Sequence, residues 1–160
     1  MAKKIGVLAL QGDFQEHLQV LERLKAEGRE VRLPRELEGL DAIIIPGGES
    51  TTISKLMVTY ELSSRIQERA KKGMALFGTC AGMILLAKEI ADADGVIPLG
   101  LMDITVRRNA FGRQVDSFEA DLPVKVLGKK PFPAVFIRAP VIESVRDGAQ
   151  VLAKLDAGTT

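Results

Sequence analysis

Ala75-Leu-Phe-Gly-Thr-Cys-Ala-Gly-Met-Ile-Leu-Leu86 contains the only cysteine of this 160-residue chain. Within it, Gly78-Thr-Cys-Ala-Gly82 has the form of a nucleophile elbow, a tight strand-to-helix turn that projects a reactive side chain above a sheet. The start of the following helix would favour the thiolate, and the N–H of Ala81 could hold an oxyanion. The alternative is that Cys80 is only a small buried hydrophobe.

The segments on either side predict the fold class. Short apolar strands alternate with amphipathic helices, the first of which starts at a capping box, Asp13-Phe-Gln-Glu16, and ends at Gly28. The pattern indicates an α/β fold with a doubly wound, mostly parallel sheet and helices on both faces. The expected strands are 5–10, 30–33, 41–46 and 75–77, and the later helices are one from about Ser50, 64–72 and 83–90.

The second half of the chain has a different pattern. Its strand-like segments are separated by turn residues rather than by helices, so we expect β-hairpins appended to the α/β core. The segments are 104–108, 115–122, 134–138 and 151–154. No linker marks a boundary, and we expect one domain over 1–160.

Composition excludes several functions. Lys plus Arg is 22 and Asp plus Glu is 21, so nothing favours a nucleic-acid partner, and no apolar run is long enough to span a membrane. A single cysteine cannot form an internal disulfide, which favours a cytoplasmic location. We expect no metal and no cofactor.

Three turns follow predicted strands, and in open α/β sheets ligands bind outside the carboxyl ends of the strands. They are Gln11-Gly12, Pro46-Gly-Gly-Glu-Ser50 and Gly78-Thr-Cys80. The second could bring backbone N–H groups to Cys80, or could be an ordinary turn with Ser50 or Thr51 as helix N-cap. Gln11 is either a structural amide or a group that orders this turn.

Several motifs together resemble one family. They are Leu8-Ala-Leu-Gln-Gly12, Pro46-Gly-Gly-Glu-Ser-Thr-Thr52, Phe77-Gly-Thr-Cys-Ala-Gly82, Leu99-Gly-Leu-Met-Asp103, the segment 108–121 and Val135-Phe-Ile-Arg-Ala-Pro140. The chain resembles, from Ile5 to about Leu155, the glutaminase subunit of pyridoxal 5′-phosphate synthase, a class I, triad-type glutamine amidotransferase.

The resemblance implies a reaction and its residues. Such a subunit hydrolyses L-glutamine to glutamate and ammonia, and passes the ammonia to a TIM-barrel synthase subunit that builds pyridoxal phosphate (vitamin B6). Cys80 would be the nucleophile, with Gly48 and Ala81 as oxyanion donors. The substrate contacts would be Gly48, Glu49, Ser50, Arg108, Ile137 and Arg138. Without the resemblance, each arginine would be read as a solvated charge at a strand end.

The chain departs from the family in its histidine. The family takes its catalytic histidine and glutamate from a His-Pro-Glu motif near the C-terminus, whereas the only histidine here is His17, in the first predicted helix. We interpret His17 as a partly exposed surface or helix-packing residue rather than a base, and expect the C-terminal part of the domain to be missing. A catalytically dead docking subunit is therefore the competing hypothesis, and a redox or stress-response hydrolase with a cysteine elbow is a third.

Overall fold

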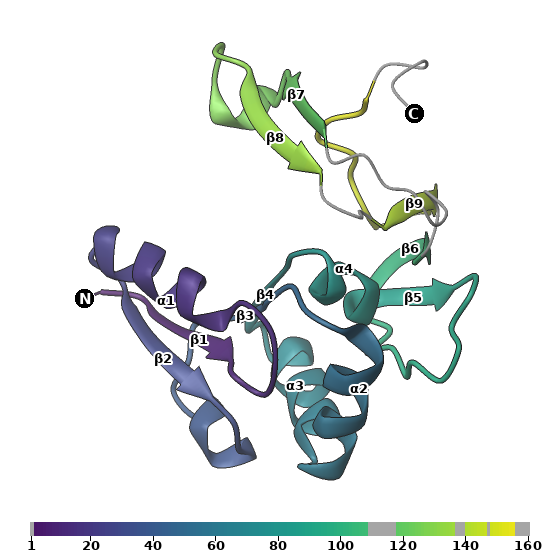
Figure 1. The fold of residues 1–160 in the computed structure, drawn as a ribbon. Helices are drawn as coiled ribbons and strands as arrows, with labels where there is room; N and C mark the ends of the chain where they lie inside the picture. The colour runs from purple at the N-terminus through teal and green to yellow at the C-terminus, as the bar shows by residue number, and fades with distance from the viewer. Residues whose placement is uncertain (1, 109–117, 137–139, 147, 156–160) are drawn as a thin grey trace.

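The computed structural model describes residues 2–108, 118–136, 140–146 and 148–155. Its main sheet has four parallel strands in the order β2-β1-β3-β4 (Figure 1). These are β1 (Lys4–Leu8), β2 (Glu27–Val31), β3 (Ala42–Ile45) and β4 (Ala75–Gly78). The predicted parallel α/β sheet is confirmed, with strand bounds shifted by a few residues.

Helices cover both faces of this sheet. The helix α1 (Phe14–Arg23) packs against β1 and β2, whereas α2 (Ser50–Thr59) and α3 (Leu62–Lys71) lie on the other side of the sheet (Figure 1). Helix α4 spans Ala81–Leu86, and 3₁₀ turns lie at η1 (Pro34–Leu37) and η2 (Lys125–Leu127). Burial on both faces explains why the central strand β3 is continuously apolar, with Ile43 fully buried, whereas β2 at the edge of the sheet is mostly polar and exposed.

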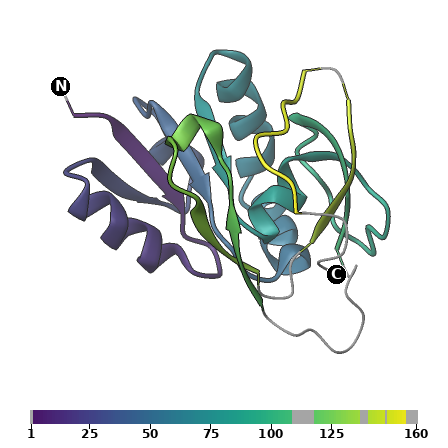
Figure 2. The same ribbon diagram turned by 90° about the horizontal axis from the view of Figure 1, so that it is seen from above.

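The later strands form two smaller sheets. β5 (Ala87–Ile90) is parallel to β6 (Met102–Arg107), which is antiparallel to β9 (Val141–Val145). β7 (Phe118–Leu122) and β8 (Phe132–Phe136) form an antiparallel hairpin, as the sequence predicted. Figures 1 and 2 show this hairpin over the middle of the molecule, between α1 and α4.

Several predicted elements were wrong in detail. The helix expected to reach residue 90 ends at Leu86, because Ala87 and the residues after it pair with β6. No strand forms in the described residues 151–154, and β9 was not predicted. Apolar runs of this length do not distinguish helix from strand, so pairing with a neighbouring strand determines which of the two forms.

The first helix also ends earlier than expected. Asp13 makes no side-chain cap hydrogen bond, so the predicted capping box does not form. Gly28 lies in β2 rather than at the helix end, and Lys25 instead adopts a left-handed φ of +55°. A Cβ on Gly28 would lie 3.2 Å from Leu21 Cδ1, so the glycine allows α1 to pack closely on β2.

Candidate active site

Cys80 occupies the turn between β4 and α4. Its φ of +49° and ψ of −106° are unusual for a residue with a side chain. The flanking glycines are required by space: a Cβ on Gly82 would lie 2.0 Å from the carbonyl oxygen of Ile45, and one on Gly78 would lie 2.5 Å from the Gly82 carbonyl carbon. The structure therefore has the strained, tightly packed elbow that the sequence predicted.

The glycine-rich turn after β3 lies beside this elbow. A Cβ built on Gly47 would lie 3.7 Å from the Cys80 Cβ. The turn is fixed from the other side, because the Asp13 N–H donates to the Gly47 carbonyl (3.0 Å) and the Glu49 N–H donates to Gln11 Oε1 (2.8 Å). All three predicted turns thus meet at one edge of the sheet, and Gln11 orders the second of them.

Gly48 and Ala81 each offer an amide at this edge. Among the described residues, the Gly48 N–H has no hydrogen-bond partner. The Ala81 N–H lies next to the Cys80 thiol and lowers its pKa. Gly48 also has a φ of +155°, which favours glycine. Two amides beside one thiol are the arrangement that an oxyanion hole needs.

Glu49 begins helix α2. Its carboxylate accepts hydrogen bonds from the Thr51 N–H (3.1 Å), the Thr52 N–H (2.6 Å) and the Thr52 hydroxyl (2.8 Å). The N-cap is therefore Glu49, and the predicted cap at Ser50 or Thr51 was wrong. Partial desolvation raises the pKa of Glu49, but the hydrogen bonds from Thr52 and Thr51 outweigh it and lower the pKa to about 2.

Arg108 reaches the same turn from the end of β6. Its guanidinium donates to the Ala93 carbonyl (3.0 Å) and the Thr51 hydroxyl (3.2 Å), and Nη2 lies 3.6 Å from Glu49 Oε1. Its side chain is only 14% exposed, so the reading as a solvated charge was wrong. Arg108 and Glu49 form a charge pair beside the amides, whereas Ile137 and Arg138 lie outside the described residues.

The electrostatics of the thiol differ from the expectation. Partial burial raises the pKa of Cys80, the Ala81 N–H lowers it, and the Asp13 carboxylate raises it further, so the net direction is upward. The expected preference for the thiolate was therefore wrong for the described residues. Desolvation is the largest of these causes, and the helix that follows Cys80 is only six residues long.

A cavity of roughly 1040 Å³ opens beside Cys80. One side is polar and is formed by Asp13, Glu16, His17 and Thr79. The opposite side is apolar and comes from the later strands, among them Leu122, Val135, Phe136, Val141 and Ile142. Sequence reasoning missed Asp13 and His17 as cavity residues; their positions just after the Gln11-Gly12 turn were the available signal. Of the predicted site residues that the structure describes, Gly48 and Cys80 line the cavity, whereas Glu49, Ala81, Arg108 and the buried Ser50 do not.

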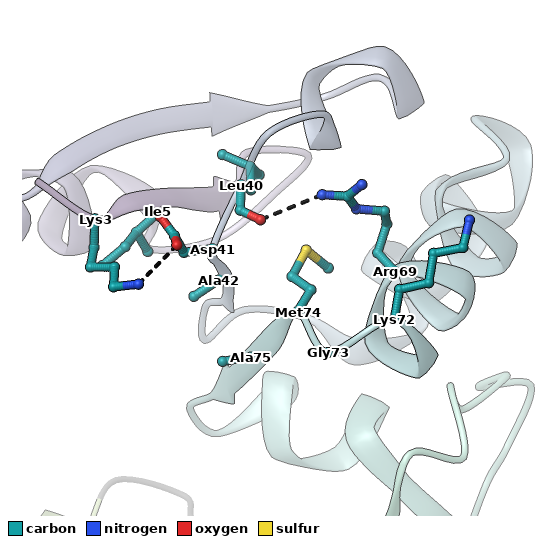
Figure 3. Close-up of a pocket in the computed structure, with 10 residues that line it drawn as sticks. All are labelled: Lys3, Ile5, Leu40, Asp41, Ala42, Arg69, Lys72, Gly73, Met74 and Ala75. Carbon is teal, nitrogen blue, oxygen red and sulfur yellow. Dashed lines mark hydrogen bonds and ion pairs between the residues drawn. The ribbon is translucent and has the colours of Figure 1, made fainter. Parts of the chain in front are cut away.

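A second cavity, of roughly 490 Å³, lies at the opposite edge of the sheet, where β1, β3 and β4 begin (Figure 3). Lys3 pairs with Asp41 there (3.0 Å), and Arg69 donates to the Leu40 carbonyl over 3.5 Å. Its lining among the described residues contains no cysteine, serine, threonine or histidine. The described residues contain no group of acidic, histidine or cysteine side chains that could hold a metal, and none of their helices is long and apolar enough to cross a membrane.

Comparisons with known proteins agree with this geometry. The sequence pattern of the SNO glutamine amidotransferase family matches residues 7–159. The chain is 62% identical to the pyridoxal 5′-phosphate synthase subunit PdxT of Dehalococcoides mccartyi over 98% of its own length and 80% of that protein. It is 60% identical to PdxT of Herpetosiphon aurantiacus, covering 96% and 82%.

A solved structure gives the same result for the fold. A crystal structure of a glutamine amidotransferase superposes with a TM-score of 0.88 at 54% identity, over 94% of this chain and 79% of that one. Both the sequence pattern and the fold thus match along nearly the whole chain. This chain belongs to the SNO family of glutamine amidotransferases.

Proposed function

We propose that the chain is a glutaminase that releases ammonia from L-glutamine for the synthesis of pyridoxal 5′-phosphate. The observation that carries the proposal is the meeting of the elbow at Cys80 with the glycine-rich turn 46–50, in a chain that matches its family over 7–159. The partner would be the TIM-barrel synthase subunit, to which the ammonia passes. A reducing cytoplasm suits the free thiol.

The chemistry follows from the positions of the groups. The Cys80 sulfur attacks the side-chain amide carbon of glutamine, the thiol proton passes to the amide nitrogen, and the C–N bond breaks to release ammonia. Water then hydrolyses the thioester to glutamate and returns a proton to the sulfur. In each half-reaction the carbonyl oxygen becomes an oxyanion, which the N–H groups of Gly48 and Ala81 stabilise. Both amides are fixed by backbone turns, so little reorganisation is needed.

The charge pair beside the amides accounts for substrate recognition. Arg108 offers donors to the α-carboxylate of glutamine, and a carboxylate such as that of Glu49 suits the α-ammonium. A carboxylate has about four acceptor sites, and the helix cap uses three of those of Glu49. Arg138 and Ile137 remain proposed further contacts from the family resemblance.

The competing function is a catalytically inactive subunit of the same fold. The observation that favours it is that His17, the single histidine of this sequence, contacts the Thr79 hydroxyl rather than the Cys80 thiol. It would bind the synthase subunit without releasing ammonia.

The test is ammonia release from L-glutamine by the chain combined with the synthase subunit. Cys80→Ala should lower the rate by a factor on the order of 10³ or more, to background. D-glutamine serves as the substrate control. If the wild-type chain releases no ammonia above the Cys80→Ala background, the glutaminase proposal is wrong and the inactive subunit is favoured.

Two adjacent arginines provide a matched pair for substrate binding. Arg108 is directed at Glu49 and Thr51, whereas Arg107 is half-exposed and pairs with Glu143. Arg108→Ala should raise the KM for glutamine about 10- to 100-fold, because a charged hydrogen bond is lost. Arg107→Ala should leave KM within about twofold, since exposed ion pairs contribute little. Equal KM values for the two variants would contradict the assignment of Arg108.

A further inference from the structure

His17 connects helix α1 to the turn that holds the nucleophile. Its side chain is half-buried, and Nε2 lies 3.3 Å from the Thr79 hydroxyl oxygen. Thr79 directly precedes Cys80, and all three residues line the same cavity. The sequence correctly predicted partial exposure for His17, but not its contact with the residue next to the thiol.

Thr79 is held from three directions. Its N–H donates to the Ile45 carbonyl in β3 (3.1 Å), and its own carbonyl accepts from the Gly82 N–H (2.8 Å). The third contact is the hydroxyl contact with His17. A strained backbone such as that of Cys80 persists only where the surrounding contacts restrain it. The three contacts of Thr79 restrain the backbone on the N-terminal side of Cys80.

The first turn of α1 and the loop before it also touch the other half of the site. Gln11 and Asp13 bond the glycine-rich turn at Glu49 and Gly47. The segment 11–17 therefore contacts both turns between which the substrate amide would lie. His17 contacts the turn that holds Cys80, whereas Gln11 and Asp13 contact the glycine-rich turn 46–50.

We propose that His17 is a positioning residue for the nucleophile: its imidazole Nε2, paired with the Thr79 hydroxyl, holds Cys80 in the conformation that faces the glycine-rich turn. A threonine hydroxyl both donates and accepts, so either neutral tautomer of His17 makes this hydrogen bond. Burial lowers the pKa of His17 and so favours the neutral ring, although Asp13 and Glu16 act in the opposite direction. The proposal rests on the glutaminase function for its consequence in catalysis.

The test is a double-mutant cycle on the two partners. His17→Phe keeps a ring of similar size without nitrogen, and Thr79→Val keeps the branched shape without the hydroxyl. His17→Gln places a polar atom near the position of Nε2 and serves as the conservative variant. Two rate constants are measured at Cys80: inactivation by 6-diazo-5-oxo-L-norleucine, a glutamine-like electrophile, and alkylation by iodoacetamide. Thermal unfolding of each variant reports folding separately.

Each single variant should lower the inactivation rate by the glutamine-like reagent about fivefold, the worth of one hydrogen bond. The double variant should also be about fivefold slower rather than about 25-fold, because both changes remove the same interaction. His17→Gln should recover most of the wild-type rate. The proposal would be overturned if both single variants were inactivated at the wild-type rate. It would also be overturned if the rate losses of the two single variants multiplied in the double variant. A lowered melting temperature with unchanged rates would also overturn it, since it would show a role in stability alone.

The two reagents separate this proposal from the proposed function. If the glutamine-like reagent does not inactivate the wild-type chain while iodoacetamide still alkylates Cys80, the glutaminase function fails. The role of His17 is then decided by iodoacetamide alone: equal, non-additive rate changes in the two single variants support it, and unchanged rates overturn it.

Discussion

Residues 4–106 and 118–155 form the same cavity but are stabilised differently. Every buried hydrophobic side chain of the described residues lies between Val7 and Val106. The later strands instead leave large apolar side chains exposed, such as Val135 at 60% and Phe132 at 48%. The first region is therefore specified by burial, whereas the second is held mainly by strand pairing and supplies the apolar wall of the cavity.

The difference shows which region fixes the backbone geometry of the site. The turns around Cys80 lie on the packed region, where glycines are required by neighbouring backbone at 1.9 to 2.5 Å from an added Cβ. Glycines in the later region, such as Gly128, have open space around them. A catalytic geometry needs the first kind of support, because a packed interior cannot shift without cost.

The sharpest way to break this comparison is to add one methyl group in each region. Gly12 and Gly128 have φ values of +100° and +109°, but only at Gly12 would the Cβ collide, 1.9 Å from the Gly47 carbonyl oxygen. Gly12→Ala should lower the free energy of unfolding by about 4 kcal/mol and displace the glycine-rich turn 46–50. Gly128→Ala should cost only about 1–2 kcal/mol, from its φ alone. Urea unfolding measures both, and equal losses would contradict the comparison.

A core truncation should have the next largest effect. Ile43 is fully buried in β3, so Ile43→Ala should lower the free energy of unfolding by about 3 kcal/mol, through lost burial and the cavity left behind. Val135→Ala in β8 should change it by less than about 0.5 kcal/mol, since that side chain is mostly exposed. A loss above about 1 kcal/mol at Val135 would show that the later region is packed more tightly than its exposure indicates.

The Glu49 cap should have a smaller effect that depends on pH. Glu49→Ala should lower the free energy of unfolding by about 1 kcal/mol at pH 7, as is typical of a lost N-cap. Because the folded-state pKa is about 2, below the ordinary 4.5, the contribution is present above about pH 4.5 and is lost as the pH falls toward 2. The difference between wild type and variant should therefore shrink between pH 5 and pH 2.5.

Glu22 provides the control for this pH dependence. It is an exposed glutamate of α1 whose side chain makes no hydrogen bond within the described residues. Glu22→Ala should change stability by less than about 0.5 kcal/mol at either pH. A difference for Glu49→Ala that stays constant with pH would show that its carboxylate is not the stabilising group.

The smallest effect concerns the hairpin itself. Phe118 and Phe136 stack across β7 and β8 with ring centroids 4.7 Å apart and planes inclined by 12°. Phe136→Leu should lower the local stability of the hairpin by about 0.5 kcal/mol, the lower range for an aromatic pair. Amide hydrogen exchange should then become faster in β7 and β8 but not in β1 or β3. Faster exchange in all four strands would mean that the hairpin and the parallel sheet unfold together.

The sequence predicted the parts of the site that depend on local chemistry. Cys80 between two glycines indicated the elbow, and Pro46-Gly-Gly indicated a turn in which amides are available, because these residue types restrict the backbone wherever they occur. The alternation of apolar strands and helices likewise predicted the parallel sheet. Period and turn chemistry are local properties, so they can be read from adjacent residues.

Only the tertiary structure decided the properties that depend on distant neighbours. His17 and Thr79 are 62 positions apart, and their contact exists because the fold brings α1, which packs on β1 and β2, to the same edge of the sheet as the turn after β4. The pairing of the partly buried Arg108 with Glu49 joins separate elements, and the upward pKa shift of Cys80 comes first from burial and then from the Asp13 carboxylate. Burial and electrostatic shifts depend on which surfaces meet in the fold, and a single sequence does not specify those distances.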